Sequence, residues 1–255
     1  LGLEDAAHAT WTTAAAMDPT GYYSERAADL VRGRQPFTPP QAFDLAVDLK
    51  AERIQAEDWV RTTFSLPEGA DLSGLGELAN DGYLQRGAEL WRLGEYELAR
   101  AELEQLRQNV QNDPVATFRL SACLLDLGLY RPAIMAARQV LNLAGMTDVS
   151  SLSAPAYFNH VRFGVYFSDL VLPNAQEYSF HPLFVFGLIR QESLFESFAS
   201  SSAAATGLMQ IIPATGQEIH NSLGWPEEYS NSDLNRPVIN LRFGMYYLDK
   251  QRSRF

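Results

Sequence analysis

Residues 181–213 read HPLFVFGLIRQESLFESFASSSAAATGLMQIIP and contain an apolar run, Leu183 to Ile189, just behind a proline. This run is too short to cross a membrane and predicts a buried helix. The helix carries one carboxylate, Glu192, near its C-terminal end, with Leu188 and Ile189 one turn back on the same face. Apolar neighbours and the negative end of a helix both favour a protonated carboxyl group. The pattern therefore points to a general acid, with a solvated glutamate at a helix end as the alternative.

The motifs in and behind this segment resemble those of the lytic transglycosylase family. RQES precedes Ser201 and GLMQIIP, and Glu192 stands fifteen residues before Gly207 and eighteen before Gln210, which is the family spacing. Residues 237–248 then resemble the family's P-x-x-N-I-x-x-G-x-x-Y-L helix. The resemblance covers residues 152–248 and implies a lysozyme-like catalytic domain.

The resemblance also implies a reaction. Glu192 matches the family's single catalytic carboxylate, which protonates the glycosidic oxygen between N-acetylmuramic acid (MurNAc) and N-acetylglucosamine (GlcNAc). The same carboxylate then acts as base on the C6 hydroxyl of MurNAc, which attacks C1 and leaves a 1,6-anhydro end. Ordinary glycosidases use two carboxylates instead. Glu196 lies one helical turn after Glu192, is not marked by the family pattern, and is expected to be a surface residue.

Four residues match positions that contact the substrate in this family: Ser193, Ser201, Met209 and Gln210. For the two serines, capping or turn roles are the alternative, because small hydroxyl residues fill such roles readily. Gly207 is expected to allow a backbone turn beside the cleft. Asn240 is expected to tie its helix to the GLMQ loop. Where the family usually has a glycine, this chain has Ala204, so the local loop conformation is in question.

An internal repeat precedes the catalytic segment. RGAELWRLGEYELARAELEQL, from Arg86, aligns with LSACLLDLGLYRPAIMAARQV, from Leu120, at a shift of 34 residues. This period, with L-G-x-Y and a following Ala, is typical of tetratricopeptide helix–turn–helix units. Such arrays can bind a protein or peptide partner, and a pure scaffold is the alternative. Trp91, Tyr96 and Tyr130 are interpreted as turn and core aromatics.

We therefore predict an all-α chain with two parts. Residues 1–150 are expected to form a helical superhelix with tetratricopeptide-like repeats, clearest at 86–140, and residues 151–255 an incomplete lysozyme-like transglycosylase domain. Helices are predicted at Leu3–Met17, Tyr22–Val31, Gln41–Phe64 and Tyr157–Leu172, with loops at 65–76 and 143–155. No alternating run predicts a strand.

Composition excludes several functions. The net charge of −11 over 255 residues argues against a nucleic-acid partner, which needs a basic face. No apolar run reaches membrane-spanning length. The four His residues lack ligand spacing, and no phosphate-binding loop occurs, so neither a metal nor a cofactor is expected. The single cysteine, Cys123, excludes an internal disulfide and is expected in the core.

The favoured function is that of a peptidoglycan lytic transglycosylase in the periplasm or another extracytoplasmic part of the cell envelope. Two alternatives stay open: a non-catalytic tetratricopeptide-type scaffold or glycan-binding protein, and a lysozyme-like hydrolase. The family continues behind the Y-L helix with an Ala-Tyr-Asn-Ala-Gly motif, which does not occur between Leu248 and Phe255. The cleft of this segment is therefore expected to miss one wall, and the segment to be weakly active or inactive.

Overall fold

The protein is helical throughout the part that the computed structural model describes, residues 2–35, 38 and 43–254. Within these ranges the only extended pairing is two isolated bridges, Ser200 with Thr206 and Thr206 with Ile211. The predicted all-α fold class is thus confirmed. None of the described helices has both the length and the apolar character needed to cross a bilayer.

The first three helices follow the prediction in part. Helices α1 (Gly2–Met17) and α2 (Tyr22–Val31) have the expected bounds and pack against each other. Helix α3 (Leu49–Thr63) is shorter than the helix expected from Gln41, because the Asp48 side chain accepts hydrogen bonds from the backbone N–H groups of Lys50 and Ala51. Such an N-cap starts a helix at the next residue. Residues 43–48 are irregular, so the prediction was wrong there, and Gln41 lies outside the described residues.

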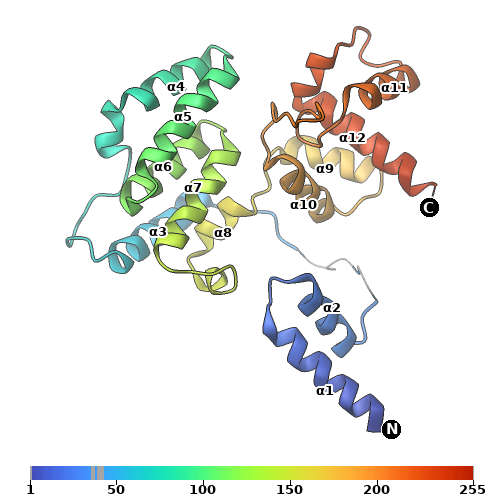
Figure 1. Ribbon diagram of the computed structural model, residues 1–255, viewed down its shortest axis with the longest axis horizontal. Helices are drawn as coiled ribbons and strands as arrows, with labels where there is room; N and C mark the ends of the chain where they lie inside the picture. Colours follow the sequence, from blue (N-terminus) through green and yellow to red (C-terminus); the bar gives the residue numbers. More distant parts are fainter. Residues whose placement is uncertain (1, 36–37, 39–42, 255) are drawn as a thin grey trace.

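The repeat region forms two helix pairs, shown in green in Figure 1. Helices α4 (Gly82–Arg92) and α5 (Tyr96–Val110) make the first pair, and α6 (Pro114–Asp126) and α7 (Tyr130–Leu143) the second. Gly94 and Gly128 have φ angles of 81° and 76°, the left-handed conformation that ends the first helix of each pair. The expected helix–turn–helix units are confirmed, whereas their tetratricopeptide class stays a prediction.

The predicted helix Tyr157–Leu172 is wrong: two short helices, α8 (Ala156–Arg162) and α9 (Ser168–Glu177), replace it. Tyr166 folds back over the break and donates a hydrogen bond from its hydroxyl to the Val161 carbonyl at 2.8 Å. A Cβ at Gly164 would lie 2.5 Å from the Tyr166 ring and 2.9 Å from the His160 carbonyl oxygen, so only glycine fits beneath that ring. Tyr166 in turn stacks on Tyr130, with ring centroids 4.0 Å apart.

Three apolar clusters pack the helices from α3 onward together. One lies within α4–α7, a second joins α3, α6, α7 and α8, and the third fills the space among the C-terminal helices α9, α10 (Pro182–Ser193), α11 (Pro213–Leu223) and α12 (Pro237–Arg252). Figure 1 shows these C-terminal helices, yellow to red, as one group beside the repeat region. Val185, Phe186 and Ile189 of α10 are buried, which confirms the predicted buried helix. Leu125 borders all three clusters, so the packing does not divide the chain at residue 150. The boundary there stays a prediction.

Candidate active site

Helix α10 places Glu192 at its C-terminal end. The helix starts at Pro182, and the His181 ring accepts a hydrogen bond from the backbone N–H of Leu183. It ends because Leu194 and Phe195 take φ angles of 51° and 63°, so the chain reverses directly behind Ser193. Left-handed conformations are costly for bulky residues and persist only where the surrounding packing enforces them. Here Phe195 is 2% exposed and anchored in the C-terminal cluster.

The Glu192 side chain is exposed and borders a pocket of about 300 Å³. The pocket walls come from α10, the loop before α11, α11 itself and α12, and their residues are Leu188, Glu192, Met209, Gln210, Ile211, Ile212, Thr215, Gly244, Tyr247 and Leu248. Three predicted site residues, Glu192, Met209 and Gln210, thus meet at one pocket. Among the described lining residues, Glu192 is the only carboxylate.

Two polar lining residues were missed as site residues by sequence reasoning. Thr215 and Tyr247 both border the pocket, and Tyr247 is 41% exposed. Tyr247 lies in the family's P-x-x-N-I-x-x-G-x-x-Y-L motif, which was the available signal, and Thr215 follows GLMQIIP by two residues. No site role was assigned to either residue, because nothing in the local sequence indicates which face of α11 or α12 meets Glu192.

The loop that carries Met209 and Gln210 is fixed by Asn240 of α12. The Asn240 side-chain oxygen accepts from the Met209 backbone N–H at 2.8 Å, and its nitrogen donates to the carbonyls of Thr206 and Leu234, also at 2.8 Å. Gly207 has a φ angle of 80°, and a Cβ there would lie 2.2 Å from the Asn240 side-chain nitrogen. The expected turn at Gly207 and the expected tie through Asn240 are both confirmed.

Met209 and Gln210 occupy this loop differently. Met209 is 9% exposed and presses on Gly244, where a Cβ would lie 2.2 Å from its sulfur. The Gln210 side-chain nitrogen donates to the carbonyls of Ala199 and Gly207 at 3.2 and 3.0 Å. Its side-chain oxygen receives no hydrogen bond within the described part of the chain. That oxygen is therefore free to accept a hydrogen bond from a hydroxyl or an acetamido N–H group of a bound sugar.

The two predicted serines do not line the pocket. Ser193 is 4% exposed, and its hydroxyl contacts the Ile189 and Leu208 carbonyls at 3.1 and 3.0 Å, which links α10 to the loop. The Ser201 hydroxyl accepts from the backbone N–H groups of Ala203 and Ala205, a turn role. A substrate contact of either serine stays a prediction. Ala204 has a φ of 58°, a conformation that explains the family's glycine at this position.

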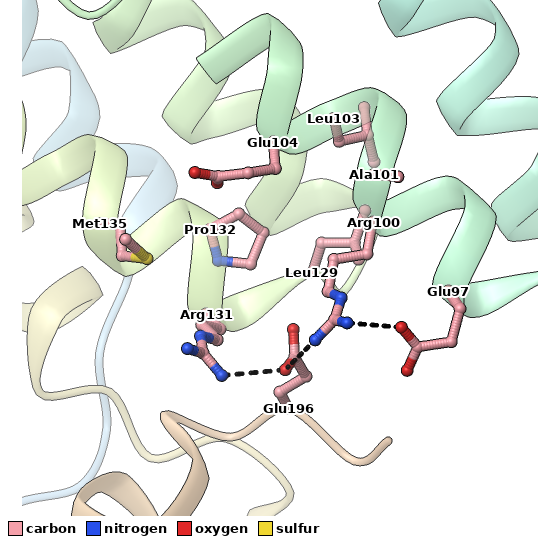
Figure 2. A pocket seen from close by; sticks show the side chains of 10 residues that line it. All are labelled: Glu97, Arg100, Ala101, Leu103, Glu104, Leu129, Arg131, Pro132, Met135 and Glu196. Atoms are coloured by element: carbon pink, nitrogen blue, oxygen red, sulfur yellow. Dashed lines mark hydrogen bonds and ion pairs between the residues drawn. The ribbon is translucent and has the colours of Figure 1, made fainter. Parts of the chain in front are cut away.

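Glu196 is not the surface residue that was expected. It is 5% exposed, and its Oε2 lies 3.1 Å from Arg131 Nη1 and 3.7 Å from Arg100 Nη1, as Figure 2 shows. The prediction assumed that the helix continued past Glu192, but α10 ends at Ser193 and the reversal turns Glu196 toward α5 and α7. Burial raises the pKa of the Glu196 carboxyl, although both arginines lower that pKa.

Comparison with known proteins agrees with this geometry. Residues 169–255 match the family model described as the transglycosylase SLT domain. The membrane-bound lytic murein transglycosylase C of Haemophilus influenzae (strain PittEE) is 32% identical over 112 residues, which are 43% of this chain and 31% of that protein. The enzyme of the same name from Actinobacillus pleuropneumoniae (serotype 5b) is 33% identical over 87 residues, 34% of this chain and 24% of that protein.

Solved structures resemble the whole chain. An inactive mutant of the Pseudomonas aeruginosa lytic transglycosylase Slt aligns with 100% of this chain and 40% of its own length, at 24% identity and a TM-score of 0.60. The 70 kDa soluble lytic transglycosylase of Escherichia coli aligns with 100% of this chain and 34% of its own length, at 18% identity and a TM-score of 0.65. The chain thus spans about a third of the length of the relatives it matches. Residues 169–255 are accordingly similar to transglycosylase SLT domains, and the fold of the whole chain is similar to that of the solved soluble lytic transglycosylases.

Proposed function

We propose that this protein is a lytic transglycosylase that cleaves the β-1,4 bond between MurNAc and GlcNAc in peptidoglycan and leaves 1,6-anhydro-MurNAc ends. The observation that carries the proposal is the single carboxylate, Glu192, on a pocket otherwise lined by apolar and neutral polar residues. A retaining or inverting glycosidase needs a second carboxylate at the scissile bond. One carboxylate suffices when the substrate's own hydroxyl is the nucleophile.

In the proposed mechanism Glu192 acts twice. As the C1–O bond breaks, the carboxyl group protonates the glycosidic oxygen, and GlcNAc leaves with a free C4 hydroxyl. The carboxylate then takes the proton from the C6 hydroxyl of MurNAc, and O6 bonds to C1. Water is not consumed, and Glu192 ends in its starting protonation state. Glu192 is exposed in the free protein, so the bound glycan itself would cover the carboxyl and exclude water from it.

The neighbouring residues would hold the sugar. Gln210 offers its unengaged side-chain oxygen to a hydroxyl or acetamido N–H, and Met209 supports the loop from behind. Ser193 would fix α10 to this loop through the Leu208 carbonyl, and Ser201 would shape the turn that precedes the loop. Direct contacts of both serines with the sugar are the alternative. No step needs a metal or another cofactor. Because peptidoglycan lies outside the cytoplasm, the site of action would be the extracytoplasmic cell envelope.

The helical repeats carry the second candidate function, a non-catalytic scaffold or glycan-binding protein with a protein or peptide partner. The observation in its favour is the helix-pair architecture of α4–α7, which builds extended surfaces in repeat proteins. A lysozyme-like hydrolase is the third reading. It is disfavoured because no second carboxylate lines the described pocket. The proposed domains are the helical superhelix, residues 1–150, and the transglycosylase domain, residues 151–255.

The test is mass spectrometry of purified peptidoglycan after digestion with the protein, with Glu192→Gln and with Glu177→Gln. Glu177 is a matched control, since it is an exposed glutamate at the last position of helix α9 and does not border the pocket. We expect anhydro-MurNAc ends, formed slowly, with the parent protein and the control, and none with Glu192→Gln. The E. coli relative has been solved in complex with bulgecin A, so binding of bulgecin A serves as a second readout.

Three outcomes would contradict the proposal. Reducing MurNAc ends would mean that water is the nucleophile and that the protein is a hydrolase. Bulgecin A binding without cleavage by any version would favour a glycan-binding protein. If the protein neither binds bulgecin A nor cleaves peptidoglycan, its function would lie in the helical repeats.

A further inference from the structure

The turn directly behind Glu192, residues 194–199, is held by the repeat region. Its Glu196 side chain lies between an arginine of α5, Arg100, and an arginine of α7, Arg131. In Figure 2 both guanidinium groups point at the same carboxylate, which enters from the segment below them. A pocket of about 520 Å³ opens above this carboxylate between the second helices of the two repeat pairs. One buried charge thus connects three segments that are far apart in the sequence.

An aromatic contact holds the same turn from its other side. Phe198 is 7% exposed and stacks on Tyr96, with ring centroids 5.5 Å apart, while Trp91 lies 5.7 Å away. Trp91 is itself fixed, because its indole N–H donates to the Leu127 carbonyl at 2.8 Å. The aromatic residues expected in the repeat turns therefore pack against the catalytic part of the chain.

A chain of hydrogen bonds leads from this turn to the pocket of Glu192. The Ala199 backbone N–H donates to the Glu196 carbonyl at 3.1 Å. The Ala199 carbonyl accepts from the Gly207 backbone N–H at 2.8 Å and from the Gln210 side chain at 3.2 Å. Gln210 lines the pocket with Glu192, which precedes the turn by two residues. Two residues of the pocket lining, Glu192 and Gln210, are therefore connected to the turn that Glu196 holds.

Fold stability does not explain why a charge is buried here. Burial raises the pKa of Glu196 above its ordinary value, so folding favours the neutral form of this carboxyl relative to the unfolded state. The contribution of Glu196 to the free energy of unfolding is therefore complete below its unfolded-state pKa and decreases as the pH rises through its folded-state pKa. Replacing a buried ion pair with well-packed hydrophobic residues of similar volume is often neutral or stabilising, whereas removal of one partner is costly when the other charge stays buried. The side chains of Arg131 and Arg100 are each 43% exposed, so water can solvate both if the carboxylate is removed.

We propose that Glu196 is a positioning residue of the transglycosylase site, whose ion pairs with Arg131 and Arg100 hold the 194–199 turn so that Gln210 stays beside Glu192. The inference rests on the proposed lytic transglycosylase function and adds to it a role for the helical repeats. The repeats supply the cations that set the geometry of the catalytic loop. The charged groups that face Glu196 come from α5, from α7 and from the segment before α12: Glu97, Arg100, Glu104, Arg131 and Arg236.

The test compares the parent protein with Glu196→Gln and with a control, Glu97→Gln. The control removes an equal charge from the same pocket, where Glu97 pairs with Arg100 but is 60% exposed. We expect Glu196→Gln to lower kcat roughly ten- to hundredfold, because misplacement of a catalytic group by about 1 Å has effects of that size. KM should change less than kcat, and the melting temperature should not fall. The control should stay within about twofold of the parent protein in kcat.

Two further readouts separate positioning from a structural role. A protonated Glu196 resembles Gln, so the ratio of parent to Glu196→Gln activity should approach one as the pH falls through the Glu196 pKa. Backbone hydrogen exchange at Ala199 and Gly207 should be faster in Glu196→Gln than in the control. The exchange measurement needs no activity and therefore tests the positioning role even if peptidoglycan cleavage fails.

The outcomes decide as follows. The positioning role is overturned if hydrogen exchange at Ala199 and Gly207 is unchanged in Glu196→Gln. It is also overturned if kcat is unchanged and the ratio of parent to Glu196→Gln activity does not vary with pH. A loss of melting temperature that fully accounts for the lost activity also overturns it, because Glu196 would then be structural. If the parent protein fails to cleave peptidoglycan while the exchange difference is present, the proposed function fails and the link between the repeats and the loop stands.

Discussion

Gly207→Ala should destabilise the C-terminal helices strongly, because two independent costs meet at this position. The residue has a φ angle of 80°, and a left-handed conformation costs an alanine about 1–2 kcal/mol. The added Cβ would also lie 2.2 Å from the Asn240 side-chain nitrogen and 2.3 Å from the Leu234 carbonyl oxygen. Neither atom can move without loss of the hydrogen bond that joins them.

The size of the effect follows from the hydrogen bonds at risk. Asn240 makes three hydrogen bonds that hold the loop and the start of α12, each with a net value of about 1 kcal/mol. With the conformational cost, the loss of unfolding free energy should be about 3–5 kcal/mol, at the upper end for single substitutions. That loss corresponds to a decrease in melting temperature of about 12 °C or more for a domain of roughly 100 residues.

Differential scanning calorimetry of the parent protein, Gly207→Ala and Gly187→Ala measures this difference. Gly187 lies in the middle of α10, has no left-handed φ, and has nothing within 4 Å of an added Cβ. Alanine there should be neutral or stabilise by about 0.5–1 kcal/mol, as in other helix interiors. A decrease of less than about 1 kcal/mol for Gly207→Ala, or equal decreases for both variants, would refute the role assigned to Gly207.

Three further predictions concern the same part of the chain. Ser193→Ala removes the hydroxyl contact with the Leu208 carbonyl that links α10 to the loop, together with the contact with the Ile189 carbonyl inside α10. It should lower the unfolding free energy by about 1–2 kcal/mol in a denaturant titration. Gly244→Ala places a Cβ against the Met209 sulfur and should cost about 1–3 kcal/mol, and Met209→Ala should recover part of this cost in a double-mutant cycle. The backbone N–H of Ser230 holds the pKa of Asp233 below its ordinary value of 3.8. The stabilisation by Asp233 should therefore be present above that pH and be lost as the pH falls through the lower folded-state pKa, and Asp233→Asn should abolish this dependence in acid titrations.

Local signals in the sequence were sufficient for the central helix and its loop. An apolar run of limited length behind a proline predicted the buried helix α10 and the place of Glu192 near its end. Gly207 in a motif of fixed spacing predicted a backbone turn, and Asn240 predicted the tie to α12. The helix and the turn depend on backbone conformation and side-chain types within a short span, which the residue order carries directly. The Asn240 tie joins residues 31 positions apart, and only the family resemblance indicated it.

The breaks between helices were not predictable in this way. The apolar pattern continues through residues 157–172, so it predicted one helix where α8 and α9 are separate. The break depends on Tyr166, which lies over Gly164 and stacks on Tyr130 from the repeat region. A contact between residues so distant in sequence leaves no trace in local periodicity.

Residue order alone thus specified an all-α chain, its paired repeat helices and the motif that carries Glu192. Only the tertiary structure decided which residues share the pocket with that carboxylate and where Glu196 points. The reversal at Leu194 and Phe195 requires left-handed backbone conformations that bulky residues avoid in isolation. Burial of Phe195 in the C-terminal cluster enforces this reversal, and the reversal turns Glu196 toward the two arginines of the repeats, because long-range packing can outweigh local conformational preference.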